Sequence, residues 1–399
     1  MLNLIGKDLY YVGDCSHTEK SFERMFNIPT GMAYNSFLYV DDKTCLIDTV
    51  DNSVIDKFLD HVKEALNGRK LDILIVQHME PDHSKAIKNI LDLYPDVHIY
   101  ASSSASRMLN LYLKKDTKNQ FTPIIPNKTT LDLGHHQLSF INATFIHWPE
   151  VIFTYDTTEK ILFSADAFGT FGANDGILFA DNIKKDDFFY SEMRRYYTNI
   201  VGKYGSYVQK VLKGAQSLEI KLICPLHGPI WRNDFATIIS LYDKWSSYTP
   251  EANNEVAIFV GSMYSNTLEA AVNLQKILIS KGIKTTLFDV SDYEVSYLVS
   301  EAFRVKNIVL ASPTYNNGIF PYMETFITHL INSGLTKRNY ALMESGSWAP
   351  MANRVMEGLL SKVKDSVILD TKVSFMCAYN PATVDSKLEA LANNIIEKM

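Results

Sequence analysis

The sequence predicts a two-domain α/β protein in which a β-rich first part is followed by a doubly wound parallel sheet. Its length of 399 residues suits two domains better than one. Strand-like segments crowd residues 1–250, whereas strands and helices alternate regularly over residues 254–399. Between these parts, Pro250 and the polar residues 251–255 are predicted to form a linker.

Composition and charge exclude several classes of protein. Apolar residues make up 46% and charged residues 21% of the chain, which predicts a globular protein with an ample core. The net charge is -6 and no basic stripe is present, so we predict no nucleic-acid partner. No apolar run approaches the roughly 18–20 residues that a membrane span needs, and the first residues lack the pattern of a secretory signal. Four dispersed cysteines without a CxxC pair predict reduced thiols and a cytoplasmic location.

The first part presents its predicted elements in a clear order. Residues 35–50 are predicted to form two strands joined by a turn at 41–43. Residues 53–66 repeat apolar side chains at helical spacing. Further strands are predicted within 71–76, 97–103, 136–148, 159–166 and 220–228. This order predicts sheets with helices outside them.

The second part alternates strands and helices. Strands are predicted at 256–260, 285–290, 307–311, 339–343 and 373–377. Between the first two, Leu274, Ile277 and Leu278 lie at helical spacing and Gly282 ends the helix. Five apolar strands that alternate with helices predict a doubly wound, five-stranded parallel sheet.

The segment "QHMEPDHSKA" places His78, Glu80, Asp82 and His83 directly after the apolar run "LDILIV". Charged groups taken from water need partners, and histidine nitrogen and carboxylate oxygen are common metal ligands. We expect alternate residues of an extended loop to face one metal centre and His83 to face another. A solvated loop is the alternative.

Three further candidate ligands lie at the ends of predicted strands. They are His147 in "TFIHWPE", Asp166 in "ILFSADAFG" and His227 in "LICPLHGP". Taken alone, a residue such as His227 is more often a surface or hydrogen-bonded histidine. Together, seven candidate ligands suit two metals better than one.

The H-x-E-x-D-H segment and the later His, Asp and His segments resemble the metallo-β-lactamase-like domain of flavodiiron proteins. The resemblance implies an αββα sandwich for residues 1–250. Hydrolytic zinc relatives usually carry HxHxDH, and Glu80 stands where they have the middle histidine. A carboxylate at this place is a harder, charged ligand, which favours iron over zinc.

The resemblance also implies which residues bind each metal. It implies His78, Glu80 and His147 for one iron, Asp82, His83 and His227 for the other, and Asp166 as the bridge between them. In some family members the histidine that matches His83 does not coordinate, so both roles stay open for it. Two ferrous ions, three carboxylates and one bridging hydroxide would make a neutral cluster. Tyr197 resembles a tyrosine near the irons in this family, and an ordinary core or surface tyrosine is the alternative.

A second predicted site consists of three loops at the carboxyl ends of strands. The loop "GSMYSNTLEAA" at 261–271 joins a strand to a helix, so its amides and hydroxyls can bind a phosphate. It is not GxxxxGK[ST], which disfavours a nucleoside triphosphatase, and an ordinary polar turn is the alternative. The other two loops lie at 312–321 and 345–354.

These loops resemble the FMN site of flavodoxins, which implies a flavodoxin-like, FMN-binding domain over residues 254–399. Ser265 departs from the glycine that many flavodoxins have. Tyr315 and Trp348 are the candidate neighbours of the flavin ring. The predicted FMN contacts are Ser262, Met263, Tyr264, Ser265, Asn266, Thr267, Ser312, Pro313, Thr314, Tyr315, Asn316, Asn317, Gly318, Ser345, Gly346, Ser347, Trp348 and Ala349.

The predicted function is that of a flavodiiron oxidoreductase that reduces dioxygen to water, nitric oxide to nitrous oxide, or both. Two ferrous ions and one reduced FMN hold the four electrons that one dioxygen needs. The resemblance implies rubredoxin or another small redox carrier as electron donor, and a head-to-tail homodimer or a dimer of dimers. The alternatives are a zinc-dependent hydrolase fused to a flavodoxin-like domain and a pure electron-transfer or interaction module. Glu80 counts against the first alternative, and the complete ligand set counts against the second.

Overall fold

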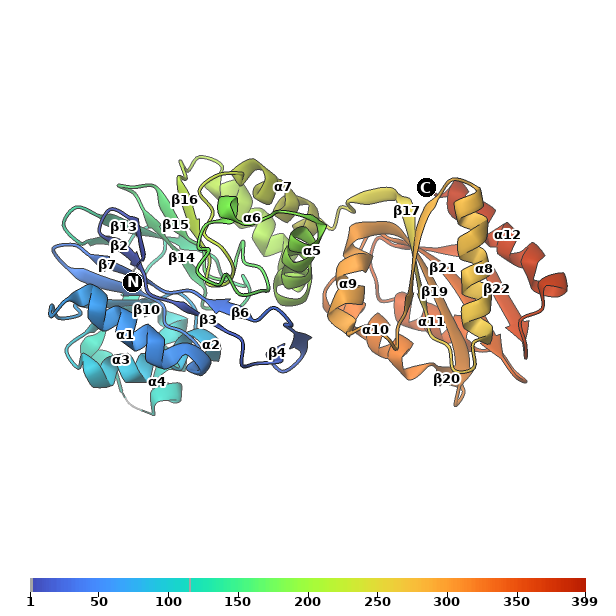
Figure 1. Ribbon diagram of the computed structural model, residues 1–399, viewed down its shortest axis with the longest axis horizontal. Helices are drawn as coiled ribbons and strands as arrows, with labels where there is room; N and C mark the ends of the chain where they lie inside the picture. Colours follow the sequence, from blue (N-terminus) through green and yellow to red (C-terminus); the bar gives the residue numbers. More distant parts are fainter. Residues whose placement is uncertain (1–2, 115) are drawn as a thin grey trace. The chain divides into compact units, whose positions relative to one another are not determined.

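The computed structural model describes residues 3–114 and 116–399, and the chain divides into two compact units (Figure 1). The first unit comprises the residues up to Tyr197 together with Ser206–Asp243. The second comprises Thr198–Gly205 and Lys244–Met399. The domain limits expected from the sequence, 1–250 and 254–399, stay predictions.

Two sheets face each other in the first unit. The larger has the strand order β1-β2-β7-β8-β9-β10-β11 and is antiparallel up to β8 and parallel from β8 onward. The smaller has the order β12-β13-β14-β15-β16, and only β15 and β16 are parallel. The strands are β1 (Asn3–Gly6), β2 (Leu9–Tyr11), β7 (Phe37–Val40), β8 (Thr44–Ile47), β9 (Ile73–Val76), β10 (His98–Ser102), β11 (Phe121–Ile124), β12 (Thr130–Asp132), β13 (Gln137–Asn142), β14 (Ile152–Asp156), β15 (Ile161–Phe163) and β16 (Leu222–Cys224).

Helices cover the outer faces of both sheets. In Figure 1, α1 to α4 lie beside the seven-stranded sheet and α5 to α7 beside the five-stranded sheet. The helices are α1 (Ile55–Leu66), α2 (Pro81–Ser84), α3 (Ile87–Leu93), α4 (Ser103–Leu113), α5 (Asp187–Tyr196), α6 (Gly205–Ala215) and α7 (Phe235–Ser246). Two short hairpins add β3 (Asp14–Ser16) with β6 (Met32–Tyr34) and β4 (Ser21–Phe22) with β5 (Phe26–Asn27). The predicted αββα sandwich is confirmed.

The core of the first unit lies between the sheets. Alternate residues of each strand point to opposite faces, so one set from each strand meets the other sheet. The Phe37 ring of β7 lies 5.3 Å from the Phe163 ring of β15, and both side chains are fully buried. In β9, Ile73 and Ile75 belong to this core, while Leu74 is buried on the opposite face. Burial on both faces explains why β9 is uniformly apolar.

The second unit contains the predicted doubly wound sheet. Five parallel strands follow the order β18-β17-β19-β21-β22, and β20 pairs antiparallel with β19. One face packs on α8 and α12, and the other packs on α9, α10 and α11 (Figure 1). The elements are β17 (Ala252–Val260), α8 (Asn266–Ser280), β18 (Lys284–Asp289), α9 (Val295–Arg304), β19 (Val305–Tyr315), β20 (Gly318–Ile319), α10 (Pro321–Asn332), β21 (Asn339–Gly346), α11 (Ala352–Leu360), β22 (Val367–Met376) and α12 (Pro381–Glu397). This strand order is the flavodoxin-like one.

Three predicted elements differ from the structure. Residues 252–255 are not linker but the start of β17, because the Asn307 side chain donates to the Asn253 carbonyl at 2.8 Å and holds this segment in the sheet. The strand predicted over 136–148 ends at Asn142, and an irregular loop follows. Residues 312–321 are largely a hairpin: Asn316 and Asn317 have φ of 49° and 60° and form the two-residue turn between β19 and β20.

Within residues 3–114 and 116–399, no helix combines the length and the apolar character that crossing a membrane requires.

Candidate functional site

Four loops bring the seven predicted ligands to one edge of the first unit. Three of these loops follow the carboxyl ends of β9, β15 and β16, and the fourth, residues 143–151, connects β13 to β14. The N–H of Ile152 donates to the Gln77 carbonyl at 3.2 Å and thereby joins the two sheets at this edge. Because both sheets contribute loops here, side chains that are far apart in the sequence meet.

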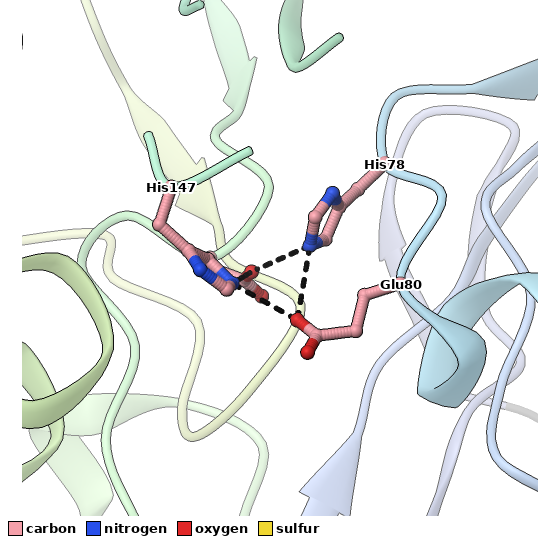
Figure 2. Close-up of side chains that lie close together, drawn as sticks. His78, Glu80 and His147 are labelled. Carbon is pink, nitrogen blue, oxygen red and sulfur yellow. Dashed lines mark hydrogen bonds and ion pairs between the residues drawn. The ribbon is translucent and has the colours of Figure 1, made fainter. Parts of the chain in front are cut away.

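The first cluster consists of His78, Glu80, His147 and Asp166. Nε2 of His78 and Nε2 of His147 lie 3.2 and 2.9 Å from Oε2 of Glu80. The same two nitrogens each lie 3.2 Å from Oδ2 of Asp166. Figure 2 shows the ends of the His78, Glu80 and His147 side chains converging. The four ligand atoms lie within 4.8 Å of one another, a spacing at which one metal ion could contact all of them.

The second cluster consists of Asp82, His83 and His227. Nε2 of His83 lies 2.9 Å from Nε2 of His227, and Oδ2 of Asp82 lies 3.2 Å from both nitrogens. Oδ1 of Asp166 lies 3.7 Å from Nε2 of His83 and 3.6 Å from Nε2 of His227. Asp166 therefore directs one oxygen toward each cluster.

The loop after β9 is not extended throughout, as the sequence pattern had suggested. Pro81 begins the helical turn α2, and the N–H of His83 donates to the Glu80 carbonyl at 2.9 Å. His78 and Glu80 face the first cluster as alternate residues of an extended segment, but the helical turn directs both Asp82 and His83 to the second cluster. The expectation from alternating residues, that Asp82 faces the same centre as Glu80, is therefore wrong, and Asp82 is grouped with His83 and His227 as the family resemblance implied.

Mutual attraction dominates the electrostatics of both clusters. Burial by itself would raise the pKa of Asp166, but His78 and His147 outweigh it and hold this pKa well below its usual value. Burial would lower the pKa of His83 and His147, yet the neighbouring Asp82 and Asp166 raise these values to about 9 each. The buried carboxylates are thus stabilised by positive charge close to them, which protons on the histidines or bound metal ions can supply.

Unpaired buried oxygens support the choice of metal ions. Oδ1 of Asp82 and Oδ1 of Asp166 are buried and have no hydrogen-bond partner. A buried carboxylate oxygen without a hydrogen bond is costly, and a coordinated cation removes this cost. A cavity of about 650 Å³, lined by Glu80, Asp82 and Tyr34 among others, lies next to these side chains. The residues present therefore fit a pair of metal ions with access from outside.

Two neighbouring tyrosines occupy different places near the clusters. The ring of Tyr196 lies 5.8 Å from the ring of His227. The ring of Tyr197 lies 5.0 Å from the ring of Tyr242, and all three tyrosines are fully buried. The role of Tyr197 stays a prediction, whereas Tyr196, which the sequence reasoning missed, contacts a predicted ligand directly.

Sequence reasoning also missed two buried carboxylates behind the clusters. Oε1 of Glu150 lies 2.9 Å from Nδ1 of His78. Oδ1 of Asp48 accepts the N–H of Gln77 at 2.7 Å, and burial raises the pKa of Asp48 to about 6. The sequence could have suggested Glu150, because this acid follows the candidate ligand His147 by three positions in "HWPE". It could also have suggested Asp48, because this acid comes directly after an apolar strand, β8, as several of the candidate ligands do.

In the second unit, the three predicted flavin loops meet at the carboxyl edge of the sheet. Oγ1 of Thr267 lies 2.8 Å from Oγ of Ser345, which joins the first loop to the third. Oγ1 of Thr314 accepts the N–H of Met351 at 2.8 Å, which joins the second loop to the third. This edge borders β17 and β19, the place where the direction of strand order reverses and where such sheets bind ligands.

In the first flavin loop, Ser265 stands where many flavodoxins have glycine. Ser265 precedes α8 and has a φ of 67°, a left-handed conformation that glycine adopts freely and serine rarely. Ser265 therefore adopts the backbone conformation of a glycine in the turn that leads into the N-terminus of α8.

The predicted flavin contacts differ in exposure. Tyr264 and Trp348 are 84% and 81% exposed to solvent, and Tyr315 is 42% exposed. Ser312 is instead buried, and its hydroxyl accepts the N–H of Phe320 at 3.1 Å. The aromatic side chains are thus available to a ligand, whereas the Ser312 hydroxyl stabilises the hairpin.

Comparisons with known proteins agree with both units. Residues 32–228 match the ODP family beta lactamase, and residues 258–381 match the flavodoxin family. The chain is 31% identical over 367 residues to a nitric oxide reductase of Moorella thermoacetica, which covers 91% of this chain and 90% of that protein.

Solved structures show the same fold. Rubredoxin oxygen:oxidoreductase from Desulfovibrio gigas superposes with a TM-score of 0.92 and 25% identity over 100% of this chain and 98% of the other. The flavodiiron protein from Giardia intestinalis gives a TM-score of 0.92 and 23% identity over 100% and 97%. With two ligand clusters that share Asp166 in one unit and a flavodoxin-like sheet in the other, the chain belongs to the flavodiiron protein family, a family of oxidoreductases.

Proposed function

We propose that this protein reduces dioxygen to water, nitric oxide to nitrous oxide, or both, at a non-haem diiron site that receives electrons from FMN. The observation that carries the proposal is Asp166, whose two oxygens face two separate clusters of ligand atoms. Relatives named nitric oxide reductase and rubredoxin oxygen:oxidoreductase support both substrates and a small redox carrier such as rubredoxin as electron donor.

The proposal assigns a role to each cluster. His78, Glu80 and His147 would hold one iron, Asp82, His83 and His227 the other, and Asp166 would bridge them. Bound iron would supply the site of diatomic reduction and bound FMN the electrons. Glu80 and Asp82 also line the cavity, so the proposed site can be reached from outside the unit. His83 and His227 are buried.

The FMN site proposed for the second unit consists of the loops that follow β17, β19 and β21. Amides at the N-terminus of α8 and the hydroxyls of Ser262 and Thr267 would bind the phosphate. Tyr315 and Trp348 are exposed beside these loops and would flank the flavin ring.

Metal and flavin content test the proposal directly. Protein purified without oxygen is expected to contain about two irons and one FMN per chain. Consumption of dioxygen and of nitric oxide is then compared with one reduced rubredoxin as donor. Two zinc ions, no flavin and no gas consumption would contradict the proposal and favour a hydrolase of the same fold.

Location and assembly belong to the proposal as well. The dispersed cysteines predict a cytoplasmic protein, and the family resemblance implies a head-to-tail homodimer or a dimer of dimers. Cell fractionation tests the location, and sedimentation of the purified protein tests the number of chains.

A further inference from the structure

Glu150 is a buried carboxylate that contacts His78 from the side opposite the first cluster. The side chains of Glu150 and His78 are both fully buried. Oε1 of Glu150 lies 2.9 Å from Nδ1 of His78 and also accepts the N–H of Met79 at 2.9 Å. A carboxylate oxygen accepts, so in the contact with Glu150 it is Nδ1 of His78 that donates. Nε2, 3.2 Å from Oε2 of Glu80, is then the ring nitrogen left for a metal ion.

The histidines of the second cluster have weaker hydrogen-bond acceptors at Nδ1, the ring nitrogen that faces away from the cluster. Nδ1 of His227 donates to the Ala33 carbonyl at 2.8 Å, and Nδ1 of His83 lies 3.4 Å from the Thr49 carbonyl. These acceptors are neutral backbone oxygens. A carboxylate is a stronger acceptor and carries a charge, so it makes the histidine that donates to it a more basic ligand.

Asp48, the other buried carboxylate behind the clusters, does not make one cluster a stronger metal site than the other in the way that Glu150 does. It accepts the backbone N–H groups of Gln77 at 2.7 Å and of His78 at 3.4 Å. Its Oδ2 also accepts the side-chain amide of Gln77 at 2.9 Å. Asp48 therefore bonds N–H groups of residues 77 and 78, whereas Glu150 contacts the ring of a proposed ligand directly.

We propose that Glu150 is a positioning residue that fixes the Nδ1–H form of His78 and makes the His78–Glu80–His147 cluster the tighter of the two metal positions. The inference rests on the proposed function only in requiring that both clusters bind metal. It concerns the order and strength of metal binding, which the choice between dioxygen and nitric oxide does not affect.

Titration of metal-free protein with ferrous iron under nitrogen tests the proposal. The wild type is expected to bind two ions with unequal affinity. Glu150→Gln keeps an acceptor without charge and should weaken the tighter position about 10-fold, and Glu150→Ala should weaken it about 100-fold. Asp156→Asn is the matched control, because it breaks another buried carboxylate–histidine pair, with His136, in the same unit. It should bind iron like the wild type. Wild-type affinity in a folded Glu150→Ala protein would overturn the proposal.

A double variant identifies the position that is affected. His227→Ala should leave the tightly bound ion of the first cluster, whereas Glu150→Ala should leave only the weaker ion of the second cluster, because the two residues act on different clusters. The combined variant should retain none. If the combined variant still binds one ion tightly, both residues act on the same position and the assignment is wrong.

A spectroscopic measurement separates positioning from general structural support. In protein loaded with diamagnetic zinc, nitrogen-15 NMR of the histidine rings should show a protonated Nδ1 of His78 in slow exchange with water. This signal should persist in Asp156→Asn and disappear or shift in Glu150→Ala. An unchanged signal in Glu150→Ala would contradict the role. If the wild type binds no pair of metals, the proposed function fails, whereas wild-type binding in the Glu150 variants defeats this inference alone.

Discussion

Asp166 lies between the two ligand clusters and directs one oxygen toward each. Its Oδ2 lies 3.2 Å from two imidazole nitrogens of the first cluster, and its Oδ1 faces the second. The preceding strand β15 ends at Phe163, and the N–H of Leu226 donates to the Ala165 carbonyl at 2.8 Å. This bond holds the loop of Asp166 against the loop that carries His227. The position of one carboxylate thus depends on neighbours in two loops.

Replacement of Asp166 by alanine is expected to abolish diatomic reduction and to lower the metal content to below about one ion per chain, because the cations lose a shared negative ligand. FMN content should stay unchanged, since the proposed flavin loops belong to the second unit. Metal and flavin are quantified in the same sample. Asp92→Asn, which removes an exposed aspartate of the first unit, is the control. A variant that keeps both metals and its rate would show that Asp166 is not the bridge.

Thr267 offers a second test at the residue scale. Its side chain is buried, and its hydroxyl bonds the Ser345 hydroxyl at 2.8 Å. Thr267→Val keeps the shape and removes the hydroxyl, which should weaken FMN by about 1–3 kcal/mol through loss of a bond to a phosphate oxygen. Fluorescence titration of the flavin-free protein measures this change, with Ser333→Ala on the far end of α10 as control. An unchanged dissociation constant would place the phosphate elsewhere.

At the scale of elements, Asp156 joins the two sheets of the first unit. It ends β14 of the smaller sheet, and its Oδ2 accepts the hydroxyl of Tyr39, on β7 of the larger sheet, at 2.9 Å. The same oxygen lies 2.7 Å from Nδ1 of His136, and the side chains of Asp156 and His136 are both fully buried. Buried polar groups that bond across two sheets fix how the sheets pack on each other.

Loss of this buried pair should lower the stability of the first unit. Asp156→Asn is expected to reduce the free energy of unfolding by about 3 kcal/mol near pH 5.5, because it leaves His136 without its charged partner. Urea unfolding of the wild type and the variant measures the difference. A difference below about 0.5 kcal/mol at pH 5.5 would contradict the role of the pair.

The pH dependence of this difference follows from two opposite shifts. Burial would lower the pKa of His136, but Asp156 outweighs burial and raises it. Burial would raise the pKa of Asp156, but His136 outweighs it and lowers it. The contribution of the pair is complete between about pH 4 and 6.5, the unfolded values. It falls as the pH drops through the lowered pKa of Asp156 or rises through the raised pKa of His136. Wild type and variant should therefore differ less at pH 9 than at pH 5.5.

At the scale of the whole molecule, the two proposed redox sites belong to separate compact units. The family resemblance implies a head-to-tail dimer in which the flavin of one chain lies beside the metals of the other. We therefore expect a two-fold homodimer with electron transfer between chains.

Subunit exchange tests this assembly. A variant without FMN is mixed with a variant without iron, and the chains are allowed to reassort. About half of the dimers should then be mixed, and each mixed dimer has one working pair of sites, so roughly a quarter of full activity should return. Verified exchange without any return of activity would show that transfer occurs within one chain.

The sequence by itself determined the fold class and the set of candidate metal ligands. Alternating apolar segments predicted the parallel sheet of the second unit, because the period of side-chain burial is a local property of strands and helices. The seven candidate ligands were visible because histidines and acids directly after apolar strands need a partner. The chemistry of these ligands can be inferred from their residue types and their order in the sequence.

Residue spacing suggested that Asp82 faces the centre of Glu80, the family resemblance implied that it joins His83 and His227, and only the tertiary structure shows the backbone that places it there. The turn at Pro81 directs Asp82 away from the cluster of Glu80, a change that depends on local backbone angles rather than on spacing. Glu150 and Tyr196 acquire their places because loops from both sheets and α5 pack around the same edge. Such contacts join residues far apart in the sequence, and their partners are set by how the sheets pack, which no local pattern records.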